Sequence, residues 1–108
     1  MPYDSKLADR IRDIAVPLGM VEKKMFGGLG FLLEGNMCVG VWKETLIARV
    51  GPEAYEPALK RTGVKEFDIT GRPMRGWVMI EAKAVKKEAA LQQWIQLAVD
   101  FVLTLPPK

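Results

Sequence analysis

Residues 21–50, VEKKMFGGLGFLLEGNMCVGVWKETLIARV, decide the fold of this chain. Short apolar runs alternate in this stretch with turns of two or three residues, such as Glu34-Gly35-Asn36 and Lys43-Glu44. This spacing is typical of an antiparallel β-meander. Extended segments are expected over 21–26, 29–33, 37–42 and 45–50, with Met37, Val39 and Val41 on one face of their strand. Both faces of the strands carry apolar side chains, so we expect a helix to cover each face at least partly.

Two amphipathic helices are expected near the ends of the chain. Residues 5–16 carry an apolar stripe and stop before Pro17, which has no N–H to donate. In residues 86–103 apolar side chains recur at helical spacing, namely Leu91, Trp94, Ile95, Ala98, Phe101 and Val102. We expect this wide stripe to face the core, and the alternative is that part of it forms a homodimer contact or binds another partner.

The middle of the chain is expected to hold shorter elements. Pro57 should interrupt the turn that Pro52 begins, so a short helix is expected from about residue 56 to residue 63. Short strands are expected over 66–69 and 77–82. The sequence therefore predicts a single α+β domain over residues 1–108. It has an antiparallel β-meander sheet of about four to six strands, flanked by an N-terminal helix, a short middle helix and a long C-terminal helix.

Composition argues against most kinds of enzyme. The 108 residues are 49% hydrophobic and include one cysteine and no histidine. Without histidine there is no Ser-His-Asp or Cys-His nucleophile and none of the common zinc sites. We therefore predict a non-enzymatic protein with no catalytic residue, cofactor or metal. No apolar run approaches the ~18–20 residues that span a bilayer, and Met1-Pro2-Tyr3-Asp4 does not begin a secretory signal. A cytoplasmic location without membrane contact is expected.

Three small features have both a functional and a structural interpretation. The glycines of Gly27-Gly28-Leu29-Gly30 suggest a phosphate loop, but they lead into a strand, so a tight turn or bulge is favoured. Cys38 lies in an apolar strand and is expected to be a buried, unreactive thiol. The carboxylate pairs Glu53 with Glu56 and Asp9 with Asp13 are expected on exposed helix faces.

Positive charge gathers in residues 60–87. The formal net charge of the whole chain is +3, but this segment alone holds eight basic and three acidic residues. The basic residues are Lys60, Arg61, Lys65, Arg72, Arg75, Lys83, Lys86 and Lys87. A solvated surface is the simpler interpretation, and weak, non-specific nucleic-acid binding through the segment is the alternative.

The stretch Arg72-Pro73-Met74-Arg75-Gly76-Trp77 is the strongest candidate for a contact surface. It combines two guanidinium groups and an indole in an expected loop, and Arg and Trp are enriched at interface hot spots. The alternative is that Trp77 begins a strand and packs in the core. The predicted partner-binding residues are Arg72, Arg75 and Trp77, assisted by Lys83, Lys86 and Lys87.

Four ordered segments carry a family resemblance. They are Met25-Phe26-Gly27-Gly28-Leu29-Gly30, Gly35-Asn36-Met37, the residues 46–52 (LIARVGP) and the residues 71–78 (GRPMRGWV). The chain resembles the N-terminal domain of the TfoX/Sxy proteins, which are bacterial regulators of natural competence for DNA transformation. The resemblance implies an α+β domain with no catalytic residues. Full-length members resemble a coactivator that works with the cyclic-AMP receptor protein and carry a second, C-terminal domain, so this chain looks like a stand-alone copy.

Three functional hypotheses follow. The first is a regulatory domain that binds a protein partner, such as part of the transcription machinery. The second is direct DNA binding through residues 60–87. The third is a small-molecule binder or enzyme with a pocket between sheet and helices, which would depend on carboxylates, lysines, Tyr3 or Tyr55.

Overall fold

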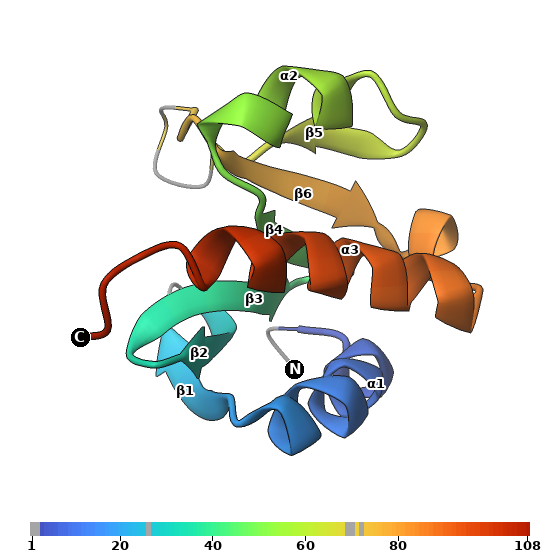
Figure 1. Ribbon diagram of the computed structural model, residues 1–108. Helices are drawn as coiled ribbons and strands as arrows, with labels where there is room; N and C mark the ends of the chain where they lie inside the picture. The colour runs from blue at the N-terminus through green and yellow to red at the C-terminus, as the bar shows by residue number, and fades with distance from the viewer. Residues whose placement is uncertain (1–2, 26, 69–70, 72) are drawn as a thin grey trace.

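Three helices pack on one face of a six-stranded antiparallel sheet. The computed structural model describes residues 3–25, 27–68, 71 and 73–108. The strands are β1 (Val21–Met25), β2 (Gly28–Leu33), β3 (Asn36–Trp42), β4 (Thr45–Arg49), β5 (Val64–Glu66) and β6 (Trp77–Glu81). In Figure 1, helix α3 crosses in front of the sheet, with α2 above it and α1 below it. The expected α+β class and the three flanking helices are confirmed.

The strand order departs from a simple meander. Neighbouring strands follow the order β1-β2-β3-β4-β6-β5, so β6 lies between β4 and β5. The strand expected at 66–69 is instead Val64–Glu66, because Val64 pairs with Ile80 and Glu66 pairs with Val78. Ile69, the last residue of that expected strand, lies outside the described residues.

Helix α1 (Ser5–Ala15) begins where the sequence predicts. The Asp4 carboxylate accepts hydrogen bonds from the backbone N–H groups of Lys6 (2.9 Å) and Leu7 (3.2 Å), which would otherwise lack partners. The chain continues as a 3-10 turn, η1 (Val16–Leu18), and Gly19 ends it in a left-handed conformation. The apolar side of α1 is buried against the sheet and α3.

Helix α2 (Pro52–Leu59) begins earlier than expected and contains Pro57. The prediction that Pro57 interrupts the turn is wrong. A proline removes one backbone donor and crowds the carbonyl four residues earlier. That carbonyl belongs to Glu53, in the exposed first turn, and the helix is tied to the sheet by buried Tyr55 and Ala58.

Helix α3 (Glu88–Val102) supplies most of the helical side of the core. Its buried residues are Leu91, Trp94, Ile95, Ala98, Val99 and Val102, so the core interpretation of its apolar stripe is confirmed. A second 3-10 turn, η2 (Ala82–Val85), connects β6 to this helix. Arg10 of α1 donates hydrogen bonds to the carbonyls of Val85 (2.8 Å) and Lys86 (3.3 Å), which joins the first helix to this connection.

The opposite face of the sheet has no helix over it in the described part of the chain. Buried residues of α1, α2 and α3 all belong to one apolar cluster, together with inward residues such as Val39 and Ile80. The other face has a small cluster of Ile47, Phe67 and Met79, against which Met37, Trp42 and Trp77 pack. The expectation of a helix on both faces is therefore wrong, because aromatic side chains cover the second face instead.

An irregularity in β3 changes which side chains share a face. The register with β2 shifts between Phe31 and Leu32, and Cys38 is the unpaired residue opposite this shift. As a consequence, the Met37 side chain lies on the helix-free face, whereas Val39 and Val41 point into the main core. The expectation that these three share a face is wrong, because a bulge reverses the alternation.

The C-terminal tail is held by the turn between β2 and β3. Asn36 is 3% exposed and is a buried polar residue in the described chain. Its side-chain amide donates a hydrogen bond to the Pro106 carbonyl at 2.9 Å, and the Lys108 N–H donates to the Glu34 carbonyl at 2.9 Å. The first bond gives the buried amide a partner, and the two bonds together hold the chain after α3 against the turn between β2 and β3.

Candidate interaction surface

The residues predicted to bind a partner fall into two separate groups. Arg75 and Trp77 lie at the beginning of β6, whereas Lys83, Lys86 and Lys87 follow its end. Four residue steps along an antiparallel strand span roughly 13 Å, so the two groups lie at opposite ends of β6. Arg72 lies outside the described residues.

Trp77 partly fits both interpretations of its role, as a packed residue and as a contact residue. It begins β6 and is half-buried on the helix-free face, where its ring centroid lies 5.8 Å from that of Phe67. Trp77 therefore contributes to the small second cluster and still presents part of its ring to solvent. Arg75, two residues earlier, is exposed.

Arg49 is a functional candidate that the sequence analysis missed. Arg49 pairs with Trp77 across β4 and β6, and its guanidinium carbon lies 5.0 Å from the Trp77 ring centroid. The same carbon lies 5.7 Å from the ring centroid of Phe101, on α3. We call Arg49, Trp77 and Phe101 the Arg49 stack. Its sequence signal is an arginine at the end of a strand, but the aromatic partners lie far along the chain.

Glycines allow this end of the sheet to close. Gly51 has φ 88° and ψ 163°, and a β-carbon there would overlap the Phe101 ring. The Gly76 carbonyl accepts hydrogen bonds from the N–H groups of Val50 (2.8 Å) and Gly51 (3.0 Å). The corner between β4 and α2 is therefore bonded to Gly76, the residue that precedes Trp77. The Arg49 stack is thus fixed by the residues that follow Arg49 and by the residue that precedes Trp77.

The Arg49 stack presents an unneutralised positive charge. Within residues 3–25, 27–68, 71 and 73–108, no carboxylate lies in ion-pair distance of the Arg49 guanidinium. Stacking on an aromatic face leaves the N–H groups in the guanidinium plane able to donate to a carboxylate. The arrangement fits an acidic side chain of another molecule.

Tyr55, on α2, feels the charges of two residues near this region. Burial raises the pKa of the Tyr55 hydroxyl, and the nearby Glu66 carboxylate raises it further, while the positive charge of Arg75 acts in the opposite direction. Tyr55 is a buried residue and packs α2 against the main core.

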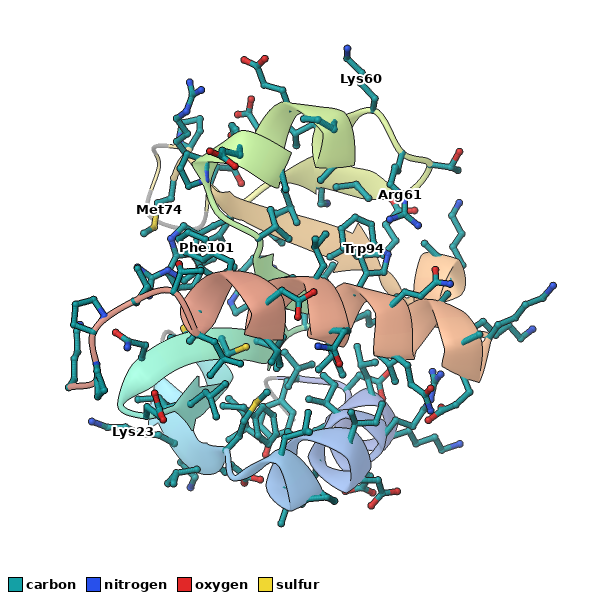
Figure 2. All side chains as sticks on the ribbon, viewed as in Figure 1. Lys23, Lys60, Arg61, Met74, Trp94 and Phe101 are labelled. Atoms are coloured by element: carbon teal, nitrogen blue, oxygen red, sulfur yellow. The ribbon has the colours of Figure 1, made fainter. Side chains whose placement is uncertain are left out.

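Two of the remaining basic residues, Arg61 and Lys83, have interaction partners in the described chain. Arg61 stacks on Trp94 with its guanidinium carbon 4.3 Å from the ring centroid, as Figure 2 shows. Lys83 lies 3.6 Å from the Glu81 carboxylate, and Lys87 precedes α3 at its N-cap position. DNA binding through residues 60–87 stays a prediction.

A cleft of about 1040 Å³ opens on the helix-free face. Tyr3, Trp42, Lys65 and Met79 are among the residues that line it. The pocket of the small-molecule hypothesis was expected between the sheet and the helices, and Tyr55 does not line this cleft. No group of three or more histidine, cysteine, aspartate or glutamate residues suited to a metal occurs in the described chain.

The glycine segment forms a turn, as favoured from the sequence. Met25 pairs with Gly28 across the β1–β2 hairpin, so the glycines lead into a strand and do not precede a helix. Gly30 leaves space for the Met25 side chain, whose sulfur would lie 2.5 Å from a β-carbon at that position. The close approach explains a glycine in the middle of β2.

Cys38 is buried, as expected. Its exposed fraction is 0%, and burial raises the pKa of its thiol from the ordinary value of 9.0 to about 12, while the positive charge of Arg49 acts in the opposite direction. A thiol that stays protonated at neutral pH is a poor nucleophile. The structure gives Cys38 a packing role.

We expect the stability of the wild-type chain to fall relative to Cys38→Ala as the pH rises from about 9 toward 12. In that window the unfolded thiol loses its proton while the folded thiol, with its pKa of about 12, retains it. The unfolded state alone gains free energy from ionisation, so the Cys38 contribution decreases with pH. Urea titrations of both chains at several pH values measure the difference. Parallel profiles would contradict the raised pKa.

The described chain defines a class of small α+β domain with helices on one face of the sheet and a cation–aromatic cluster at one end of it. Residues 16–102 match the family model described as the TfoX N-terminal domain. The chain therefore belongs to the TfoX N-terminal domain family, which is a family of competence-related regulatory domains. No curated protein and no solved structure matches it. None of the helices in the described residues has the length and hydropathy needed to cross a membrane.

Proposed function

We propose that the chain is a non-enzymatic regulatory domain that binds an acidic segment of a protein partner through the Arg49 stack and Arg75. The observation that carries this proposal is the Arg49 guanidinium, which lies close to the rings of both Trp77 and Phe101 and has no carboxylate partner among the described residues. An arginine fixed by aromatic rings loses little side-chain entropy when it forms a bidentate contact.

The kind of partner follows from family and charge together. Membership in a family of competence-related regulatory domains supports a partner in the transcription machinery, a coactivator role and a bacterial, cytoplasmic setting. The Arg49 stack supports an acidic surface on that partner. The absence of histidine from the sequence supports a role in binding without bond-breaking chemistry.

The partner-binding surface is tested with matched charge-removing variants. We expect the Arg49→Gln/Arg75→Gln variant to capture about 30-fold less of the proteins that the immobilised wild-type chain retains from a bacterial lysate. That factor corresponds to a hot-spot loss of about 2 kcal/mol. Lys86→Gln/Lys87→Gln removes the same charge from the opposite end of β6 and is expected to retain those proteins. Quantitative mass spectrometry measures each captured protein.

The retained proteins should also leave the wild-type chain as salt concentration rises, because the contact is between opposite charges. Circular dichroism melting of both double variants controls for loss of the fold. The same set of captured proteins for the wild type and Arg49→Gln/Arg75→Gln would refute the proposal.

A further inference from the structure

Strand β1 leaves one edge of the sheet open. It lies at the end of the strand order and pairs with β2 alone in the described chain. Val21, Glu22, Lys23 and Lys24 are all exposed. An edge strand carries backbone N–H and C=O groups that a second strand can pair with. The sequence of β1 indicates which strand fits.

The β1 sequence, VEKKM, is complementary to itself in the antiparallel direction. If two copies pair around a twofold axis at Lys23, Val21 of each copy lies opposite Met25 of the other. In the same register Glu22 of each copy lies opposite Lys24 of the other. Apolar pairs and opposite charges across neighbouring strands both stabilise a sheet. We propose that β1 pairs antiparallel with β1 of a second copy in this register and joins the two sheets.

The two kinds of pair lie on different faces. Side chains alternate along a strand, so Val21, Lys23 and Met25 share one face and Glu22 and Lys24 share the other. Lys23 lies opposite Gly30, which belongs to the helix-free face with Met25 packed over it. The apolar pairs therefore extend the helix-free face, and the charged pairs lie on the face that carries α1.

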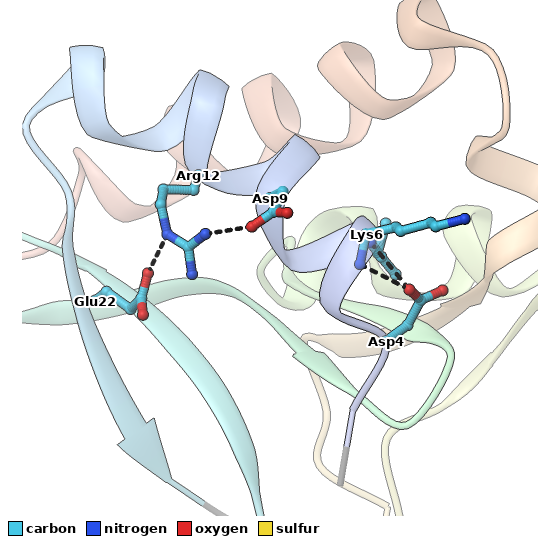
Figure 3. A network of polar contacts seen from close by, with 6 residues as sticks. Asp4, Lys6, Asp9, Arg12 and Glu22 are labelled. Carbon is cyan, nitrogen blue, oxygen red and sulfur yellow. Dashed lines mark hydrogen bonds and ion pairs between the residues drawn. The ribbon is translucent and has the colours of Figure 1, made fainter. Parts of the chain in front are cut away.

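Helix α1 reinforces the charged pairs. Arg12 donates to the Glu22 carboxylate at 2.6 Å and to the Asp9 carboxylate at 2.6 Å, as Figure 3 shows. This interaction keeps the Glu22 side chain on the α1 face, where Lys24 of the second copy would arrive. The one like-charge pair in the register is Lys23 with its own copy, at the twofold axis.

Three exposed apolar residues lie at this edge or shortly before it in the sequence. Val21 is 67% exposed, Val16 is 54% exposed and Leu18 is 45% exposed. These three residues lie within six positions of one another, at η1 and the start of β1, and the other exposed large hydrophobic residues of the described chain are Met74 and Leu103. Covering this patch would add apolar area to the backbone pairing.

Other surfaces of the chain suit a second copy less well. The opposite edge strand, β5, has only three residues, and its self-pairing would place Val64 opposite Glu66. The apolar stripe of α3, which the sequence analysis offered as a homodimer contact, is buried in the core. The β1 edge thus has both the length and the complementarity that the proposal requires.

The test inverts one charge at a time. Glu22→Lys gives a strand with Lys at 22 and 24, and Lys24→Glu gives a strand with Glu at both positions. Each variant replaces two attractive cross-strand pairs by two repulsive ones, so we expect its self-association to weaken at least tenfold. An equimolar mixture of the two variants restores every charged pair and should associate at least as tightly as the wild type.

Sedimentation velocity between about 1 μM and 1 mM measures each association, a range that covers weak and strong dimers. Lys65→Glu makes the same charge change as Lys24→Glu but on β5, so this variant should dimerise as tightly as the wild type. Lys23→Thr removes the like-charge pair at the twofold axis and should make the dimer tighter. The mixture distinguishes lost pairing from lost folding, because two unfolded variants would not restore a dimer.

Three results would overturn the proposal: a wild-type chain that stays monomeric at 1 mM, single variants that associate like the wild type, or a mixture that gains nothing. Arg49→Gln/Arg75→Gln should dimerise normally, so failure at the β1 edge and failure at the Arg49 stack are distinguishable.

Discussion

Replacing Gly51 by alanine is expected to reduce the free energy of unfolding by about 3 kcal/mol or more, which is a large part of the ~5–15 kcal/mol typical of a domain. Two costs combine at this position. The backbone has φ 88° and ψ 163°, a region that residues with a β-carbon almost never occupy. The new β-carbon would also overlap the Phe101 ring, so α3 or its side chain must move.

The displacement of Phe101 should also change the candidate interaction surface. Phe101 is one of the two rings that flank the Arg49 guanidinium, so the Gly51→Ala variant should lose partner binding even at temperatures where it remains folded. Urea denaturation measures the stability, and capture of proteins from a bacterial lysate measures the binding.

Gly19→Ala provides a control for alanine in the ordinary left-handed conformation and in open space. Gly19 has φ 90°, close to that of Gly51, but a β-carbon at Gly19 would have no neighbouring atom within 4 Å. Alanine there should cost only about 1 kcal/mol, the ordinary penalty of the left-handed conformation. Equal losses for the two variants would mean that neither the backbone conformation of Gly51 nor the Phe101 ring adds to the ordinary left-handed penalty.

Trp94→Ala is expected to reduce the free energy of unfolding by about 3–5 kcal/mol. Trp94 is 2% exposed and packs between α3 and the main core, so its removal leaves a large cavity. The loss should appear as a lower midpoint in urea and a lower melting temperature. Trp94→Phe keeps much of the volume and should lose less than Trp94→Ala. A loss of unfolding free energy below about 1 kcal/mol, as expected for an exposed residue, would contradict the burial of Trp94.

A double-mutant cycle separates the packing of Trp94 from its contact with Arg61. The Arg61 guanidinium carbon lies 4.3 Å from the Trp94 ring centroid. A cation–aromatic contact at an exposed arginine contributes about 0.5–1 kcal/mol, so Arg61→Ala alone should have a small effect. The two single changes should not add, because the contact is lost in either variant.

Much of the fold is predictable from local patterns. The stripe that contains Leu91 and Ile95 predicts α3 because helical periodicity over fifteen residues is a strong signal. The turns at Gly35 and Lys43 predict the hairpins β2–β3 and β3–β4 because each joins two short apolar runs. These elements depend on neighbours in the sequence, so the sequence alone determines them well.

The errors occur where distant residues decide. Pro57 remains inside α2 because Tyr55 and Ala58 anchor that helix to the core. Strand β5 begins at Val64 because β6, which follows it in the chain, supplies its pairing partner. The reversal at Met37 depends on a register shift between two strands, which no composition or periodicity within one strand reveals.

The candidate site was only partly predictable for the same reason. Arg75 and Trp77 stand out as a charged and aromatic loop. Arg49 does not stand out, because its role depends on cross-strand pairing with Trp77 and on Phe101 from the last helix. Closeness in sequence groups Lys83 and Lys87 with Arg75, whereas a five-residue strand separates them in space.

The position of β6 between β4 and β5 has a consequence for synthesis of the chain. Residues 64–66 leave the ribosome before residues 77–81, yet β5 has β6 as its sheet neighbour. Strands β1 to β4 pair in the order in which they are translated, so this hairpin series can assemble early. Residues 64–66 can pair only after residues 77–81 have been translated, and α3 packs over the core after that. Ribosome-bound intermediates should thus protect β1 to β4 from proteolysis well before β5.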